Sequence, residues 1–173
     1  MLIKDRHIYF STFTVQNWVS VFEDFPDAND IIVDSLDYLS KEEGLIVYAF
    51  VIMRDHIHIV WEMPSIVALD SISRRFRSFT GSNIIKLLKK LDEEYLGNFQ
   101  SERKDRSHKY WKIGSNDYHL THRDIVLQKI KYIHDNPTKG DCRSVEDPKD
   151  FWFSSARFYD GDASAFSFLK MFK

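Results

Sequence analysis

The fold is decided by residues 45–63, which read LIVYAFVIMRDHIHIVWEM. Two apolar runs, 45–53 and 56–63, are rich in the β-branched and aromatic residues that are typical of strands. They flank a polar pair at 54–55, and two strands separated by two residues indicate an antiparallel hairpin with a tight turn. The sequence therefore predicts an antiparallel pair of strands near the middle of the chain.

The sequence on either side of the hairpin predicts further strands and helices. In chain order we expect a strand over 7–15, a helix over 26–43, a helix over 65–91 broken near 80–82, strands over 109–113 and 117–120, and a helix over 121–136 capped by Thr121. Strands mixed with helices favour an α+β fold with helices packed on an antiparallel sheet. The length of 173 residues predicts one domain, 1–173, with an aromatic C-terminal tail, about 141–173, packed back on the body.

Composition excludes several classes of protein. A hydrophobic content of 43% and an aromatic content of 15% suffice for a packed core and argue against disorder. The single cysteine, Cys142, excludes an internal disulfide and a cysteine-rich zinc site, and it fits a reducing compartment. No apolar run reaches the length of a signal peptide or a membrane span, so we expect a cytoplasmic protein with no membrane partner.

The net charge of −2 argues weakly against a nucleic-acid-binding protein, but the charges are unevenly distributed. Residues 23–43 contain eight acidic residues and one basic residue, whereas 71–90 contain six basic residues and no acidic one. Each run is compatible with a solvated helix face, and the basic run is also a candidate phosphate-binding surface. We expect the acidic segment to lie away from bound nucleic acid and the basic segment beside the strand 56–63. If both share one face, the charge pattern gives no support to nucleic-acid binding.

The second strand of the hairpin carries two histidines, His56 and His58. Side chains alternate between the faces of a strand, so both imidazoles are expected on one face, with Ile57 and Ile59 on the other. Two imidazoles at this spacing are within reach of one metal ion. They are equally compatible with structural histidines that have hydrogen-bonding partners. Glu62 is expected on the histidine face, where it would support the metal from outside its ligand shell.

A second candidate group lies in the helix expected over 121–136. Because successive residues turn by about 100°, Ile130 and Ile133 share an apolar stripe, whereas Tyr132 and Asn136 share a different face. A tyrosine hydroxyl can attack a DNA phosphorus and form a covalent phosphotyrosine when a cation neutralises the phosphate. Two histidines and one amide oxygen would form an open metal site for that reaction. The alternative is a surface tyrosine that packs on the sheet.

These residues belong to a longer series of motifs. In chain order the sequence contains YAFVIM followed by HIH (48–58), RFRSFT (75–80), YWK (110–112), QKIKYIHDNP (128–137) and FSSARFY (153–159). In this order, and over roughly 7–160, the motifs resemble those of the REP-associated tyrosine transposases, which are single-tyrosine transposases of the HUH superfamily.

The resemblance implies a ferredoxin-like antiparallel sheet with helices packed on it, the fold of the HUH endonucleases. It implies His56 and His58 as metal ligands, Asn136 as the third ligand, magnesium or manganese as the metal, and Tyr132 as the nucleophile. The implied activity is the cutting and rejoining of single-stranded or hairpin DNA through a 5′-phosphotyrosine and a free 3′-hydroxyl. A monomer or a homodimer would carry it out.

Two sets of side chains are candidates for direct contact with DNA. Phosphate contacts are expected from Arg74, Arg75, Arg77, Lys86, Lys89 and Lys90 in the basic run, and from Arg103, Lys104 and Arg106 in a polar loop. Tyr110 and Trp111 are candidates for stacking on bases, and they are equally compatible with a place in the core.

Two stretches depart from the family pattern. Arg54-Asp55 stands where the family usually has Pro-Asn, and residues 138–143 read TKGDCR where it usually has VKAGLV or a similar run. Neither change removes a catalytic group, so both bear on substrate positioning. Two alternatives stay open: a domesticated protein that binds DNA hairpins without cutting them, and a replication initiator or relaxase of the same superfamily, which often carries further domains or a second tyrosine.

Overall fold

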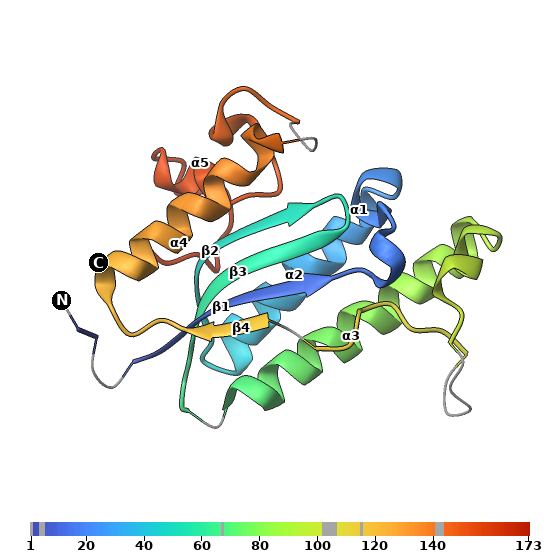
Figure 1. Cartoon of the computed structure of the whole chain (residues 1–173), viewed down its shortest axis with the longest axis horizontal. Helices are drawn as coiled ribbons and strands as arrows, with labels where there is room; N and C mark the ends of the chain where they lie inside the picture. The colour runs from blue at the N-terminus through green and yellow to red at the C-terminus, as the bar shows by residue number, and fades with distance from the viewer. Residues whose placement is uncertain (1, 4–5, 67, 102–106, 115, 141–143) are drawn as a thin grey trace.

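The computed structural model describes residues 2–3, 6–66, 68–101, 107–114, 116–140 and 144–173 (Figure 1). Three of the basic residues expected to contact DNA, Arg103, Lys104 and Arg106, lie outside the described residues, as does Cys142. Within the described ranges, no helix combines the length and the apolar composition that a membrane crossing needs.

Four antiparallel strands form one sheet in the order β2-β3-β1-β4. Their bounds are β1 His7–Thr14, β2 Ile46–Met53, β3 His56–Met63 and β4 Asn116–His119. The predicted hairpin is confirmed, because β2 and β3 pair antiparallel across a two-residue turn. The strand expected over 109–113 is wrong, because that stretch makes only an isolated bridge between Val15 and Trp111.

In the part of the chain that the structure describes, five α-helices and several 3₁₀ turns surround the sheet. The helices are α1 Val21–Asp24, α2 Asp27–Glu42, α3 Ala68–Leu91, α4 Arg123–Asp135 and α5 Ala156–Tyr159, and the 3₁₀ turns include η1 Gln16–Trp18, η2 Tyr95–Phe99, η3 Asn136–Thr138 and η5 Pro148–Asp150. The three long helices predicted from the sequence are confirmed. The cap expected from Thr121 is wrong, because His122 occupies the N-cap position of α4 and the Thr121 hydroxyl bonds to its imidazole.

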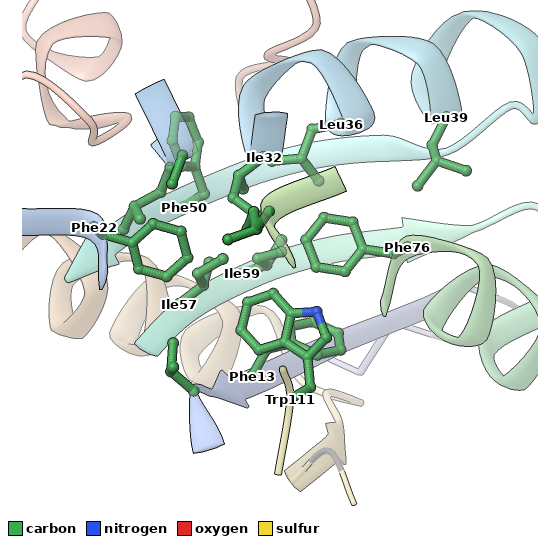
Figure 2. Close-up of a cluster of buried hydrophobic side chains, with 14 of the residues drawn as sticks. Phe13, Phe22, Ile32, Leu36, Leu39, Phe50, Ile57, Ile59, Phe76 and Trp111 are labelled. Atoms are coloured by element: carbon green, nitrogen blue, oxygen red, sulfur yellow. The ribbon is translucent and has the colours of Figure 1, made fainter. Parts of the chain in front are cut away.

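The larger hydrophobic core lies between the sheet and the pair α2 and α3 (Figure 2). Its centre consists of buried side chains from all three elements, including Ile57 and Ile59 of β3, Ile32 and Leu36 of α2, and Phe76 of α3. The residues of β3 alternate as predicted, so the isoleucines face this core and the histidines face away from it.

A smaller core covers the opposite face of the sheet. There Val126, Ile130 and Ile133 of α4 pack against the sheet residues Phe10 and Val60. The C-terminal segment reaches both cores, since Phe168 lies in the larger cluster and Phe172 in the smaller one. Its Leu169 forms a bridge with Val47, at the free edge of β2. Among the described helices, α4 therefore supplies the apolar stripe that packs on the histidine face, and the C-terminal segment adds Phe172 to the same core.

The expected separation of the acidic and basic segments is wrong. Acidic α2 and basic α3 lie side by side on the same face of the sheet, opposite the histidines (Figure 1). Each helix carries an apolar stripe that the larger core buries, and their opposite charges attract, so Arg75 donates to both Glu43 carboxylate oxygens. The charge pattern therefore gives no support to nucleic-acid binding on the histidine face.

The expected break in the helix at 80–82 is also wrong, because α3 is continuous through Gly81. A Cβ at that position would lie 3.3 Å from Trp111 Cδ1 and 3.3 Å from Tyr110 Cβ, and both side chains are buried. Glycine at this position allows the helix to approach the segment that follows the polar loop.

The close approach at Gly81 predicts a loss of stability on substitution. We expect Gly81→Val to lower the free energy of unfolding by roughly 1–3 kcal/mol, because the branched side chain overpacks against two buried aromatic rings. Urea denaturation followed by tryptophan fluorescence measures this loss. The matched control is Ser82→Val at the exposed neighbouring position, and an equal loss in both variants would contradict the packing argument.

Candidate functional site

Three of the residues singled out in the sequence lie together between β3 and α4. The ring centroids of His56 and His58 are 4.8 Å apart, and those of His58 and Tyr132 are 5.4 Å apart. Strand alternation directs both imidazoles toward α4, and the helix presents Tyr132 from beside its apolar stripe. All three belong to one chain.

Each imidazole is held through its Nδ1 atom. Asp55 Oδ1 lies 2.6 Å from His56 Nδ1, and Thr12 Oγ1 lies 2.8 Å from His58 Nδ1. The Asp55 carboxylate accepts from Nδ1–H of His56 and so fixes the tautomer in which Nε2 carries the free lone pair. The Thr12 hydroxyl orients the His58 ring through the same atom. This arrangement orients both rings and leaves the two Nε2 atoms as the candidate ligand atoms.

His58 is neutral at physiological pH. Burial lowers the pKa of its imidazole to about 3, and the electrostatic interactions with His56 and Lys129 lower it in the same direction. The side chain is also stacked on Phe10, at a centroid distance of 5.3 Å. A neutral imidazole is the protonation state that a metal ligand requires.

Tyr132 is 47% exposed, which is high for an aromatic residue at a packed interface. The edge of its ring contacts Phe10 at a centroid distance of 5.9 Å, and Lys129 Nζ lies 5.5 Å from the centre of the ring. One side of the Tyr132 ring is therefore held by Phe10 and Lys129, and the rest of the side chain is exposed to solvent. Such a group is accessible to a macromolecular substrate.

Asn136 is not joined to the histidines by any hydrogen bond of the described residues. Its side-chain nitrogen donates to the backbone carbonyl of Tyr132, at 2.9 Å, in the last turn of α4. This bond fixes the amide beside the nucleophile and leaves its oxygen as the candidate donor. The role of Asn136 as a third ligand stays a prediction.

The two histidines supply only part of the ligand set that a divalent cation needs. No group of three or more His, Cys, Asp or Glu side chains able to hold a metal occurs in the described ranges, so His56 and His58 would supply only part of a ligand shell. Two oriented imidazoles with open positions still fit such an ion, because amide, phosphate and water oxygens can complete the shell.

Glu62 does not support this site. It lies on the histidine face but at the far end of β3, where Arg6 Nη2 donates to it at 2.6 Å and the hydroxyl of Tyr48 also bonds to it. The expectation that Glu62 assists the metal ligands is therefore wrong. The pKa of Glu62 is lowered chiefly by its hydrogen bond from Arg6, against the effect of burial.

The basic residues of α3 that were expected to contact DNA are separated from the site. Most basic side chains of α3 are exposed, on the face of the sheet opposite the histidines: Arg74, Arg75, Lys86, Lys89 and Lys90, with Arg77 half-buried. Tyr110 and Trp111 are buried in the larger core. Of the two roles considered for this pair, base stacking is therefore wrong and a place in the core is confirmed.

Four residues that surround the site were not predicted from the sequence. Thr12 and Phe10 alternate along β1 onto the histidine face, and Lys129 lies three residues before Tyr132, hence on the same side of α4. Tyr118 pairs with Phe10 across β1 and β4. Strand alternation and helical spacing would have found the first three, whereas Tyr118 depends on strand pairing between segments far apart in the sequence.

Comparison with known proteins identifies the family. The family model of the IS200-like transposases matches residues 6–115, a segment that contains the histidine pair and ends before α4. The comparison with curated proteins gives no match.

Two solved structures resemble the chain. One is described as the structure of a REP-associated tyrosine transposase bound to a REP hairpin; it is 15% identical, with a TM-score of 0.67 over 94% of this chain and 84% of that one. The other, a putative transposase from Deinococcus radiodurans R1, is 13% identical, with a TM-score of 0.49 over 75% of this chain and 92% of that one. The first confirms the α+β fold that the motifs implied. Because the family model matches residues 6–115, which is more than half of this chain, the chain belongs to the IS200-like transposase family.

Proposed function

We propose that this protein is a metal-dependent single-stranded DNA endonuclease and strand transferase that cuts hairpin-associated DNA. The observation that carries the proposal is the ring contact of 5.4 Å between His58 and Tyr132, which brings a candidate nucleophile to a candidate metal ligand. Membership of a transposase family supports DNA as the substrate. The hairpin bound to the structural neighbour supports a hairpin in particular.

The proposed reaction is a transesterification at a backbone phosphate. The Tyr132 oxygen forms a bond to phosphorus while the bond from phosphorus to the 3′ oxygen breaks; the phenol loses a proton and the leaving oxygen gains one. The products are a 5′-phosphotyrosine and a free 3′-hydroxyl. Attack of another 3′-hydroxyl on that linkage reverses the chemistry and rejoins DNA.

The residues around the site have separate roles in the proposed reaction. His56, His58 and the predicted ligand Asn136 would hold magnesium or manganese, and the bound cation would neutralise charge on the phosphate. Asp55 and Thr12 orient the imidazoles, and Phe10 supports the rings of His58 and Tyr132. Since the histidines and the tyrosine meet within one chain, we propose that Tyr132 acts on the metal site of its own chain.

The proposal predicts a covalent protein–DNA adduct. We expect wild-type protein with hairpin-bearing single-stranded DNA and Mn²⁺ to give a species that survives denaturing electrophoresis and whose linked peptide contains Tyr132. A chelator should abolish it. Tyr132→Phe should lower adduct formation by more than about 1,000-fold, because phenylalanine keeps the ring and removes the attacking oxygen.

The matched control is Tyr38→Phe, which alters an exposed tyrosine of α2 on the opposite face of the sheet. It should form the adduct at the wild-type rate. Unchanged adduct formation by Tyr132→Phe would contradict the assignment of the nucleophile. Tight hairpin binding without any adduct, insensitive to chelator, would instead support the domesticated binding protein.

A further inference from the structure

An aromatic strip continues from Tyr132 to the edge of the sheet. Tyr118 of β4 is 58% exposed and lies next to Phe10, at a ring centroid distance of 6.4 Å. Phe10 in turn contacts the Tyr132 ring. β4 is an edge strand, so within the described ranges no further strand pairs with its outer side (Figure 1). The strip thus consists of two open tyrosine rings with a buried phenylalanine between them.

The ammonium group of Lys129 lies over the strip. Lys129 Nζ is 4.5 Å from the centre of the Phe10 ring, 5.5 Å from that of Tyr132 and 5.9 Å from that of Tyr118. Its neighbour Lys131 forms an ion pair with Asp135 at 2.7 Å, whereas no carboxylate of the described residues lies within ion-pair distance of Lys129. An ammonium group without a counter-charge, placed on aromatic faces, is available to an anionic ligand.

We propose that Tyr118 and Lys129 form a binding subsite for one nucleotide of single-stranded DNA, next to the phosphate that Tyr132 attacks. A base would stack on the open face of Tyr118, and a backbone phosphate would contact the Lys129 ammonium. Stacking on aromatic rings combined with cationic contacts to the backbone is the usual chemistry of single-strand recognition. A base inside a duplex has both faces covered, so the subsite selects an unpaired nucleotide.

The inference rests on the proposed function for its substrate but assigns residues outside the metal and nucleophile set. It also explains how DNA would be held on the histidine face, where α3 contributes no charge. The subsite lies on β4 and α4, and α4 carries both Lys129 and Tyr132.

The test measures binding in a background that cannot cut. Tyr132→Phe protein in chelator is titrated with a fluorescent hairpin carrying a single-stranded flank, and anisotropy gives the Kd. Adding Tyr118→Ala should weaken binding at least about fivefold, and Tyr118→Phe should retain it, because stacking needs the ring and not the hydroxyl. A blunt hairpin without the flank should bind both variants alike.

The contribution of Lys129 is read from salt dependence. Lys129→Ala should reduce the slope of log Kd against log salt concentration by about 0.7, the value for one phosphate contact on a single strand. The matched controls are Tyr38→Ala and Lys131→Ala, which should leave both the Kd and the slope unchanged. Thermal melting of every variant verifies that it is folded.

The outcomes separate the subsite from the cleavage proposal. If Tyr118→Ala binds the flanked hairpin as tightly as Tyr38→Ala does, the subsite is refuted, whatever the wild-type protein cuts. If Tyr118→Ala weakens binding to the flanked hairpin only, the subsite stands even where the wild-type protein forms no adduct. An equal loss on the blunt hairpin refutes single-strand selectivity, and with it the proposal.

Discussion

Replacing His58 with alanine is expected to remove the metal site and, with it, cleavage. His58 is buried, neutral and oriented by Thr12, which are the properties of a metal-binding imidazole. Alanine at this position supplies no ligand atom. Loss of an outer partner of a metal ligand typically costs about 10–100-fold in metal affinity or activity. Loss of the ligand itself should therefore cost more than about 100-fold in both.

The measurement that isolates this effect is metal affinity in the absence of DNA. Free Mn²⁺ followed by electron paramagnetic resonance gives the Kd for each variant. Thr12→Val keeps the shape of the side chain and removes its hydroxyl, so it should weaken binding by about 10–100-fold, between wild type and His58→Ala. His119→Ala, at an exposed position on β4 where the imidazole stacks on Tyr9, is the matched control and should bind as wild type does.

An equal Mn²⁺ affinity in wild type and His58→Ala would contradict the metal site directly, whatever the activity. Equal affinities in Thr12→Val and wild type would leave His58 as a ligand but remove the role assigned to the Thr12 hydroxyl. The graded series therefore tests the ligand and its support separately.

The strand pattern was the most informative part of the sequence. The alternation in β3 decides which face each side chain occupies, because a one-residue change of register would reverse it. For that reason the sequence alone predicted that His56 and His58 share one face and that Ile57 and Ile59 occupy the other. Their distance from Tyr132 did not follow, because it depends on how α4 packs across the sheet.

The predictions that proved wrong, the helix break near Gly81 and the separation of α2 from α3, have a common physical cause. Gly81 has a poor helix propensity, and only its packing against Tyr110 and Trp111 explains why it lies in a continuous helix. The positions of α2 and α3 were likewise set by apolar stripes that share one core rather than by net charge. Local propensity and charge patterning carry no information about contacts between distant segments, and these contacts decided both cases.

Buried histidines also predict acid-sensitive stability. Burial lowers the pKa of His58 to about 3 and that of His134 to about 4, against 6.5 for an exposed histidine. In the unfolded chain both imidazoles bind a proton as the pH falls below 6.5, whereas in the folded protein both stay neutral. Protonation therefore favours unfolding, and the stability present above pH 6.5 is lost as the pH falls toward the folded pKa values.

The expected size of the loss follows from this difference. From pH 7 to pH 5 each histidine should contribute a loss of about 2 kcal/mol in the free energy of unfolding of the metal-free protein, about 4 kcal/mol for the pair. Urea denaturation in chelator at half-unit pH intervals measures it. Carboxylates whose pKa is lowered in the folded state, such as Glu62, lose their contribution at lower pH, so the window from pH 5 to 6.5 reports the histidines.

The assignment to particular side chains is tested by glutamine, which keeps a hydrogen-bonding amide and does not titrate. His134→Gln should remove about half of the pH dependence, because only the imidazole bonded to Ser155 Oγ at 2.8 Å is lost. His58→Gln should remove the other half, and the double variant should be nearly flat between pH 5 and 6.5. If the double variant loses stability as steeply as wild type does, the acid sensitivity lies elsewhere. The neutral state of His58, on which its role as a metal ligand depends, would then lack support.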